Sequence, residues 1–147
     1  MKLASENKSA IGEFQISIPA GLIGMPKLNS FSIALEDNGW PFMHLKSAGG
    51  QEVQFVVIDP GAVIQDYEIE LSDEDAELLD IKSAADAMVL NIVTVHSLRP
   101  QYVTANLIGP LVINRHTGVG KQVIVMSWNR VSATYPLIDE RGQKNAA

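Results

Sequence analysis

The chain of 147 residues contains no cysteine. This absence excludes a disulfide framework, a thiolate nucleophile and any cysteine-ligated zinc or iron–sulfur site. Long hydrophobic runs are also missing, because no window approaches the roughly 18 consecutive apolar residues that span a bilayer. The first twenty residues lack the apolar core of a signal peptide. We therefore expect a cytoplasmic protein without a membrane segment.

Basic residues are scarce relative to acidic ones. Eleven Lys and Arg stand against 17 Asp and Glu, which gives a net charge of -6. Nucleic-acid affinity comes largely from Lys and Arg at phosphates, so this balance predicts no direct binding of nucleic acid. The acids concentrate in "DYEIELSDEDAELLD", residues 66–80, where eight of fifteen residues are acidic and none is basic. The cluster of acidic residues predicts that this segment binds a basic partner protein.

Catalytic and metal-binding patterns are absent from the sequence as well. The three histidines, His44, His96 and His116, show no spacing typical of metal ligands, and there is no Gly-x-Ser-x-Gly motif. We predict no metal, no cofactor and no enzymatic activity. If the chain were an enzyme, Asp59 and His96 would be the least implausible acid–base pair.

The sequence Gly118-Val119-Gly120-Lys121 resembles part of a phosphate-binding loop. A Walker-type loop needs a glycine five residues before the Gly-Lys pair and a Ser or Thr after the lysine, but Arg115 and Gln122 occupy these positions. The following Val-Ile-Val favours a strand rather than the required helix. We interpret the stretch as a hairpin in which both glycines adopt positive φ.

What the sequence does contain is a series of short β-type segments separated by turn residues. Alternating or β-branched runs predict strands at residues 14–18, 31–35, 55–58, 88–95, 103–108, 111–114 and 122–126. Ser72 before an acidic run predicts one short helix, and Ser83 predicts a further turn. The prediction is a mainly β, small antiparallel β-barrel-like single domain over 1–147, folded over about 12–137 with mobile termini. We expect six residues to fill its interior: Val89, Ile92, Val93, Val112, Val123 and Val125.

Four stretches together resemble the flagellar assembly factor FliW family. They are "GLIGMPKLNSF" (21–31), "VVIDPGAVIQDYEIELSD" (56–73), "IVTVHS" (92–97) and "TANLIGPLVINRHTGVGKQVIV" (104–125). The family usually has Gly-Leu-Pro-Gly-Phe in the first stretch, whereas Ile23 and Met25 stand here in place of the proline and the aromatic residue.

The resemblance implies a non-enzymatic regulator with a β-barrel-like fold. Members of this family bind the translational repressor CsrA through an allosteric surface rather than by covering its RNA-binding face. They also bind flagellin, so that free flagellin leaves CsrA free to repress flagellin mRNA. The resemblance thus implies two partners, CsrA and flagellin. A small-molecule-binding β-barrel is the alternative function, and a barrel enzyme is the third.

The acidic segment is the predicted partner-binding site. In an extended chain Asp66, Glu68 and Glu70 project to one face, while Tyr67, Ile69 and Leu71 project to the other and anchor the segment. We include Tyr67 in the site as the residue embedded in this row. Asp73 and Glu74 follow at the predicted helix start, where the macrodipole stabilises them without a partner, so they are secondary candidates. The predicted site comprises Asp66, Tyr67, Glu68, Glu70, Asp73 and Glu74.

Overall fold

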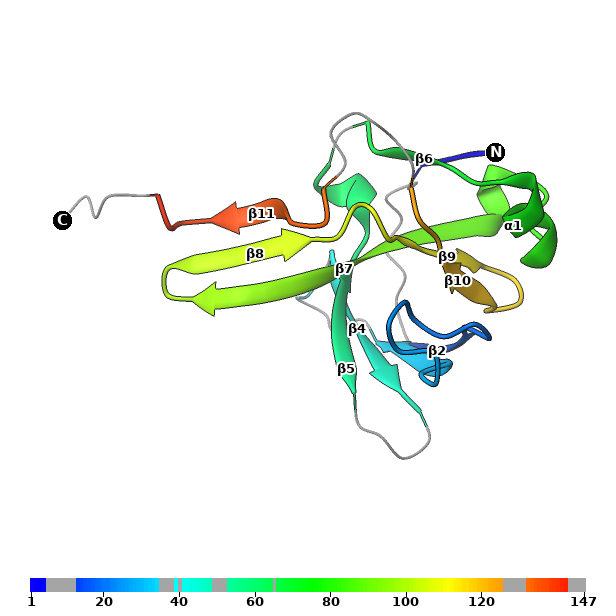
Figure 1. The fold of residues 1–147 in the computed structure, drawn as a ribbon, viewed down its shortest axis with the longest axis horizontal. Coiled ribbons are helices and arrows are strands. Elements are labelled where there is room, and N and C mark those ends of the chain that lie inside the picture. Colours follow the sequence, from blue (N-terminus) through cyan, green and yellow to red (C-terminus); the bar gives the residue numbers. More distant parts are fainter. Residues whose placement is uncertain are drawn as a thin grey trace.

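The structure, a computed structural model, describes residues 1–4, 13–34, 39, 41–48, 53–64, 66–125 and 132–142. These residues form a mainly β fold with one α-helix and two 3-10 helices (Figure 1). The elements are β1 (Lys2–Ala4), β2 (Glu13–Ser17), β3 (Ser30–Ala34), β4 (Phe42–Ser47), β5 (Gln54–Ile58), η1 (Pro60–Ala62), β6 (Glu68–Glu70), α1 (Asp73–Leu78), η2 (Ala84–Asp86), β7 (Ala87–Leu98), β8 (Gln101–Ala105), β9 (Leu111–Asn114), β10 (Gly120–Gln122) and β11 (Tyr135–Asp139).

The main sheet has nine antiparallel strands. Seven of them follow the order β10-β9-β7-β5-β4-β3-β2, and β8 pairs with both β7 and β11. One parallel bridge between Ser17 and Val119 joins the two ends of the seven-strand path, and the Ser17 amide donates to the Gly118 carbonyl at 2.9 Å. The sheet is therefore barrel-like without a continuous closing ladder. The predicted mainly β, antiparallel fold with a short helix is confirmed.

Apolar side chains fill the inside of the curved sheet. Alternation along β3 and β4 turns Phe31, Ile33 and Leu45 inward, and all three are fully buried. The buried members of this interior cluster are Ile16, Ile18, Leu22, Phe31, Ile33, Met43, Leu45, Val57, Met88, Leu90, Leu111 and Ile113. Because these side chains fill the interior, this arrangement argues against the alternative function of a hollow barrel that binds a small molecule inside.

The central strand β7 corrects part of the predicted interior. Met88 and Leu90 belong to the interior cluster and Ile92 packs against it, whereas Val89 lies in a second cluster on the opposite face. Val93 belongs to a third cluster. The other three predicted interior residues also lie outside the interior cluster, since the second cluster contains or is packed by Val112, Val123 and Val125. Both faces of β7 are covered, so its apolar run lacks the alternation that would have distinguished inward from outward positions.

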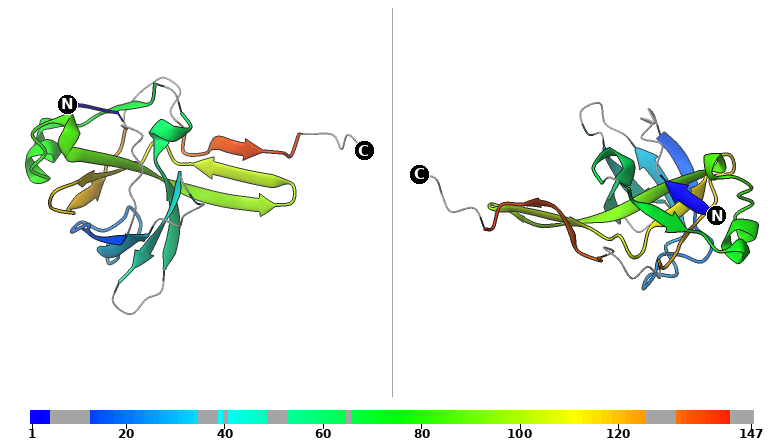
Figure 2. Two further views of the ribbon diagram at one scale, coloured as in Figure 1. Left: turned by 180° about the vertical axis from the view of Figure 1, so that it is seen from behind. Right: turned by 90° about the horizontal axis from the view of Figure 1, so that it is seen from above.

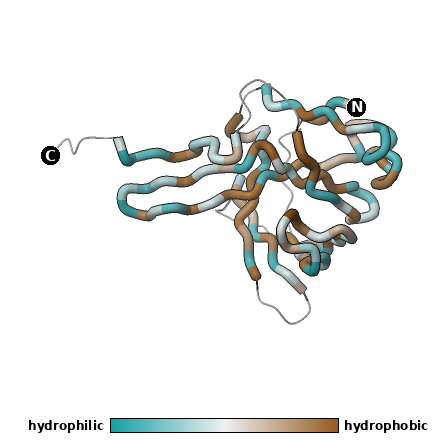
Figure 3. Tube along the Cα trace, viewed as in Figure 1, coloured by the Kyte–Doolittle hydropathy of each residue, from teal (hydrophilic) through white to brown (hydrophobic). Residues whose placement is uncertain are grey.

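A second layer covers the outer face of β7 and β9. This layer consists of the ribbon formed by β1 and β6 and of the helix α1. The second cluster lies beneath it, and Val125 packs against that cluster. Its buried members are Leu3, Ile69, Leu71, Ala76, Leu79, Ile81, Ala87, Val89, Val112 and Val123. Figure 3 shows hydrophilic residues along α1, of which Asp73, Glu74 and Glu77 are exposed. β1 lies outside the predicted folded range of about 12–137, because three residues are too few to show a period of two.

A three-stranded arm extends from the barrel-like body (Figure 2). It consists of Val93–Leu98 of β7, β8 and β11, and its edge strand β11 reaches Asp139. β7 changes partner along one edge, since Ala87–Leu90 pair with β9 and Val93–Leu98 pair with β8. β5 pairs with β7 on the other edge, through Asn91, Ile92 and Val93. β7 thus belongs to both the body and the arm.

The predicted hairpin is confirmed, since β9 and β10 pair on either side of Gly118, but its details differ from the prediction. β10 ends at Gln122, so the strand predicted at residues 122–126 is wrong over Val123–Val125, and Met126 lies outside the described residues. Beyond Gln122, the amides of Val123 and Val125 donate to the carbonyls of Pro110 and Ile108. Only Gly118 of the two hairpin glycines has a positive φ, at 74°.

Gly118 allows a sharp test of why the hairpin needs glycine. Gly118 and Gly24 have similar φ values of 74° and 84°, but a Cβ atom at Gly118 would lie 2.8 Å from the Gln15 carbonyl oxygen, whereas nothing lies within 4 Å at Gly24. Both alanine variants share the left-handed strain of about 1 to 2 kcal/mol. We expect Gly118→Ala to cost about 1 to 3 kcal/mol more than Gly24→Ala in chemical denaturation, through the added clash. Equal losses would show that the contact with Gln15 is unimportant.

Candidate protein-binding surface

The acidic segment follows β6 on the surface of the second layer. Glu68 and Glu70 are exposed, whereas Ile69 and Leu71 are each only 1% exposed and lie in the second cluster. This arrangement matches the predicted separation of acidic and apolar side chains. The strand therefore presents carboxylates to solvent while its apolar side chains attach it to the body.

Asp66 departs from the predicted extended row. Its φ is 60°, in the left-handed region, and it belongs to a turn before β6 rather than to the strand. Aspartate tolerates this region better than most residues because its short side chain bonds locally. Asp66 is exposed, so its carboxylate is accessible, but the strand geometry does not fix its direction.

Tyr67 is half-buried and points its hydroxyl into the protein. This hydroxyl donates to the Leu107 carbonyl at 2.7 Å and accepts from the Asn91 side-chain amide at 3.2 Å. Burial raises the pKa of the Tyr67 hydroxyl, and the hydrogen bond from Asn91 partly offsets that rise. The structure therefore gives Tyr67 an anchoring role between the segment and the loop after β8.

β1 brings positive charge next to the acidic row, which the sequence did not predict. Lys2 is the register partner of Glu70, and the Met1 amino nitrogen donates to the Glu70 carboxylate at 3.2 Å. The same nitrogen donates to the Leu71 carbonyl at 2.9 Å. Glu70 thus has an internal cationic neighbour, while no ion pair within the described residues involves Glu68 or Asp66.

The helix start carries the remaining predicted residues. Ser72 caps α1 as predicted, since its hydroxyl accepts from the Asp75 amide at 3.1 Å. Asp73 and Glu74 are exposed at the first turn. The Asp75 carboxylate instead accepts from the Lys121 ammonium at 2.6 Å. The lysine that suggested a phosphate-binding loop therefore connects the β10 strand to the helix.

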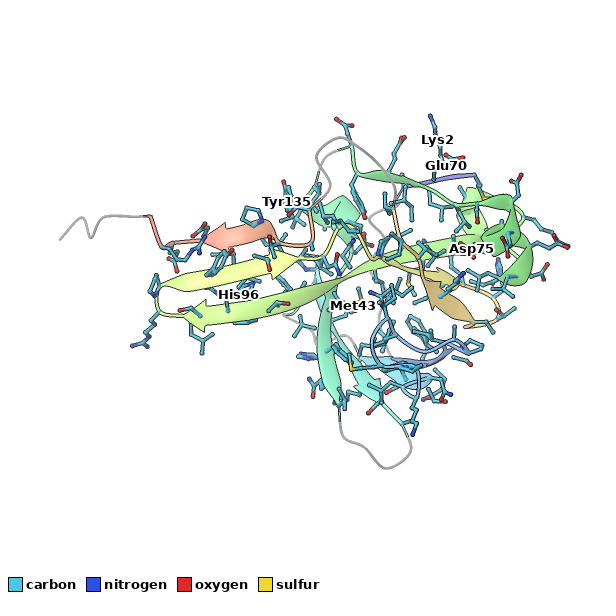
Figure 4. The ribbon with its side chains drawn as sticks, viewed as in Figure 1. Lys2, Met43, Glu70, Asp75, His96 and Tyr135 are labelled. Carbon is cyan, nitrogen blue, oxygen red and sulfur yellow. The ribbon has the colours of Figure 1, made fainter. Side chains whose placement is uncertain are left out.

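A groove lies beside the acidic strand. It has a volume of about 510 Å3, and its wall is formed by Lys2, Glu68, Ile69, Glu70, Ser72, Ile124 and Val125. Ile124 is 53% exposed, so an apolar side chain is accessible beside the carboxylates. Figure 4 shows Lys2 and Glu70 close together at one end of the molecule, with Asp75 on the same side. The sequence did not indicate Ile124 and Val125 as site residues, because a β-branched run of this kind is typical of a buried strand.

The predicted acid–base pair is not brought together. β5 runs antiparallel to β7, with Val56 opposite Val93 and Ile58 opposite Asn91. Asp59, the residue after β5, therefore lies toward the start of β7, whereas His96 lies toward the end of β7. This register separates the two positions by about 20 Å along β7. Asp59 caps η1 through a 3.0 Å hydrogen bond from the Gly61 amide, and His96 contacts the Thr104 hydroxyl at 2.7 Å on the arm (Figure 4).

The three histidines do not share a site. His44 contacts the Gln54 side chain at 2.6 Å, His96 contacts Thr104, and His116 pairs with the Asp86 carboxylate at 2.9 Å. Across the residues that the structure describes, no group of three or more His, Cys, Asp or Glu side chains could hold a metal ion. Nor does any helix in this part of the chain have the length and apolar character to cross a membrane.

The comparisons with known proteins agree with the fold. The family model described as "FliW protein" matches residues 4–137. The chain belongs to the FliW family. A flagellar assembly factor FliW from Natranaerobius thermophilus is 35% identical over 129 residues, covering 88% of this chain and 85% of that protein. One from Clostridium novyi is 37% identical over 126 residues, covering 85% of this chain and 86% of that protein.

The fold is also that of a FliW structure. The crystal structure of the flagellar assembly factor FliW superposes with a TM-score of 0.77 at 30% sequence identity, and the match covers 96% of this chain and 99% of that chain. Coverage of both proteins is almost complete. The FliW family is therefore supported by sequence and by fold over the barrel-like body, the acidic segment and most of the arm.

Proposed function

We propose that this chain is a non-enzymatic flagellar assembly factor that binds the translational repressor CsrA and relieves its hold on flagellin mRNA. Membership of the FliW family supports this role, because the relatives in that family are named flagellar assembly factors. The observation that carries the CsrA part is the exposed carboxylate row of β6 on a protein of net charge -6. An RNA-binding protein such as CsrA is expected to carry excess positive charge, and the row complements a basic patch that lies away from the RNA-binding face, as allosteric antagonism requires.

The binding site in this proposal combines the row and the groove. Glu68 and Asp66 supply exposed carboxylates without an ion-pair partner among the described residues, and Glu70 supplies one that Met1 contacts. Ile124 and Val125 add apolar contact beside them. A basic segment carrying an apolar side chain fits this combination. Charge speeds and orients the encounter, while the apolar contact adds affinity.

Asp73 and Glu74 have a supporting place in the proposal. They are exposed and lie immediately after the row, but the N-terminus of α1 already stabilises their charge. Tyr67 acts from beneath the surface by fixing the segment to Leu107. We expect direct contact with CsrA mainly from Asp66, Glu68 and Glu70.

Binding of flagellin is the second part of the proposal, and a cytoplasmic location follows from both partners. Competition between flagellin and CsrA for this chain would link the level of free flagellin to flagellin synthesis. The alternative of a small-molecule-binding β-barrel is less well supported, because the interior cluster fills the curved sheet. The alternative of a barrel enzyme loses its one candidate acid–base pair, because Asp59 and His96 lie far apart along β7.

Release of RNA from CsrA tests the proposal directly. In a gel-shift titration, adding this chain to the complex of cognate CsrA with flagellin leader RNA is expected to return the RNA to its free mobility. The chain alone should leave the RNA unshifted at physiological salt, because its net charge is -6. A shift of the RNA by the chain alone, or no release at saturating concentration, would contradict the proposal.

A further inference from the structure

A second cavity, of about 370 Å3, lies where the turn between β9 and β10 meets β2 and the start of β7. Phe14 and Met88 supply apolar surface, and Arg115, His116, Thr117 and Gly118 supply the polar side. None of the acidic residues proposed to bind CsrA lines it. The cavity is therefore separate from the acidic surface proposed to bind CsrA.

The turn that lines this cavity is held by several hydrogen bonds. Asn114 accepts from the amides of His116 and Thr117 at 2.8 and 3.2 Å, and the Arg115 amide donates to the Asp86 carbonyl at 2.8 Å. The Arg115 Nε donates to the Ala87 carbonyl at 3.1 Å. Arg115 is exposed, and this one hydrogen bond through Nε restrains its guanidinium group before any ligand arrives, which lowers the entropic cost of binding.

The terminal nitrogens of Arg115 are available to a ligand. They form no hydrogen bond or ion pair with the residues that the structure describes. The nearby Asp86 carboxylate already accepts from the amides of Lys82 and Ser83 and from His116 Nε2. The hydrogen bond from His116 and those from the two amides lower the Asp86 pKa. The two terminal nitrogens of Arg115 therefore remain available as hydrogen-bond donors, because the Asp86 carboxylate is bonded to Lys82, Ser83 and His116.

We propose that this cavity binds a small organic carboxylate carried on an apolar chain. Guanidinium donors match the two oxygens of a carboxylate, and the side chains of Phe14 and Met88 receive the apolar part. Met88 is 9% exposed and Phe14 packs against the interior cluster, so both are supported from behind. The cavity volume is near the lower limit of about 300 Å3 for ligand pockets, which fits a ligand of about the size of an acylated dipeptide. The carboxylate belongs either to the C-terminus of a peptide that ends in an apolar residue or to a free carboxylic acid.

Calorimetry and NMR with three probes test the proposal. The probes are N-acetyl-leucyl-leucine with a free carboxylate, its C-terminal amide, and hexanoate. The free peptide acid is expected to bind, to shift the Thr117 and Gly118 amide resonances, and to bind at least about tenfold more tightly than the amide. Hexanoate binding equal to that of the peptide acid would identify the free acid as the sufficient ligand, whereas peptide binding alone would identify a chain terminus. No saturable binding of either acid, or equal binding of acid and amide, would overturn the proposal.

Variants of Arg115 locate the recognition. Arg115→Met keeps the apolar stem and is expected to weaken acid binding at least about tenfold, whereas Arg115→Lys keeps the charge without the paired donors and should give an intermediate loss. Arg99→Met, in the turn between β7 and β8, is the matched control and should bind as the wild type does. Folding of each variant is checked by its NMR spectrum, because Arg115→Met also loses the hydrogen bond to Ala87. A folded Arg115→Met that binds the acid normally would overturn the proposal, and the acid–amide comparison on the wild type decides it independently of folding.

Discussion

Removing the acidic row is expected to weaken CsrA binding by at least about tenfold, which corresponds to roughly 1.4 kcal/mol. The variant combines Glu68→Lys and Glu70→Lys with Asp66→Asn. Asparagine is chosen at residue 66 because its φ of 60° would strain lysine, whereas asparagine tolerates this region. Both glutamates are exposed, so the reversal repels a basic partner. Because a lysine at residue 70 would also face Lys2 and the Met1 amino group, folding of the variant is checked by circular dichroism before binding is measured, and Glu68→Lys with Glu70→Gln is the variant that avoids this repulsion. Calorimetry against cognate CsrA at two salt concentrations measures the loss and its electrostatic share.

The matched control reverses the neighbouring acids at the helix start. Asp73→Lys with Glu74→Lys should reduce CsrA affinity less and lower the melting temperature more, because cations at the N-terminus of α1 oppose its macrodipole. Asp75 is left unchanged because it pairs with Lys121. Wild-type CsrA affinity in a correctly folded row variant would mean that the carboxylates of β6 only solvate the surface. A larger loss from the helix variant would move the interface to α1.

Asn114→Ala is expected to reduce the free energy of unfolding by about 3 kcal/mol, by removing four hydrogen bonds to backbone groups that are buried or partly buried. The side chain is 2% exposed, and its amide nitrogen donates to the carbonyls of Leu79 and Asp80 at 2.8 and 3.1 Å. Its oxygen accepts from the His116 and Thr117 amides. One residue thus joins the end of α1 to the turn between β9 and β10. For a chain of this length the melting temperature should fall by about 10 °C.

Asn29→Ala provides the control for this change. Asn29 is exposed outside the strands, and its side chain makes no hydrogen bond within the described residues, so the variant should stay within about 0.5 kcal/mol of the wild type. Thermal and urea denaturation of both variants measure the difference. If Asn114→Ala were as stable as Asn29→Ala, water would have to replace all four hydrogen bonds, and Asn114 would not be what joins the end of α1 to the turn.

Local sequence signals predicted most strands of the fold. Four strands lie within one residue of their predicted positions: β2, β3, β5 and β9. In β2 and β3, apolar residues alternate with polar ones, and β5 and β9 are short apolar runs bounded by turn residues. The α1 start at Ser72 and the turn at Ser83 also follow from side-chain capping. These features depend on residues that are close in the sequence, which is why a single sequence reveals them.

Features that depend on distant contacts could not be predicted. β1 exists because Leu3 packs beside Ile69, and the Lys121–Asp75 ion pair joins positions 46 residues apart. Gly120 needs to be glycine because a Cβ atom would lie 2.8 Å from the Ile113 side chain, not because of its own φ. The acidic row itself was visible in the sequence, but the apolar groove beside it requires the path of Val123–Val125 across the second layer.

β7 pairs with β9 along its first half and with β8 along its second half, and the two halves are expected to differ in their stability against local unfolding. Its first residues are paired with β9 and covered on both faces, whereas Val95 and Leu98 in the arm are 48% and 75% exposed, and β5 no longer pairs beyond Val93. Opening the arm breaks the ladders to β8 and β11 but leaves the interior cluster intact, so it costs less than global unfolding. The body can thus persist while the distal strands exchange with solvent, and fraying at the tip ends where β5 joins the sheet.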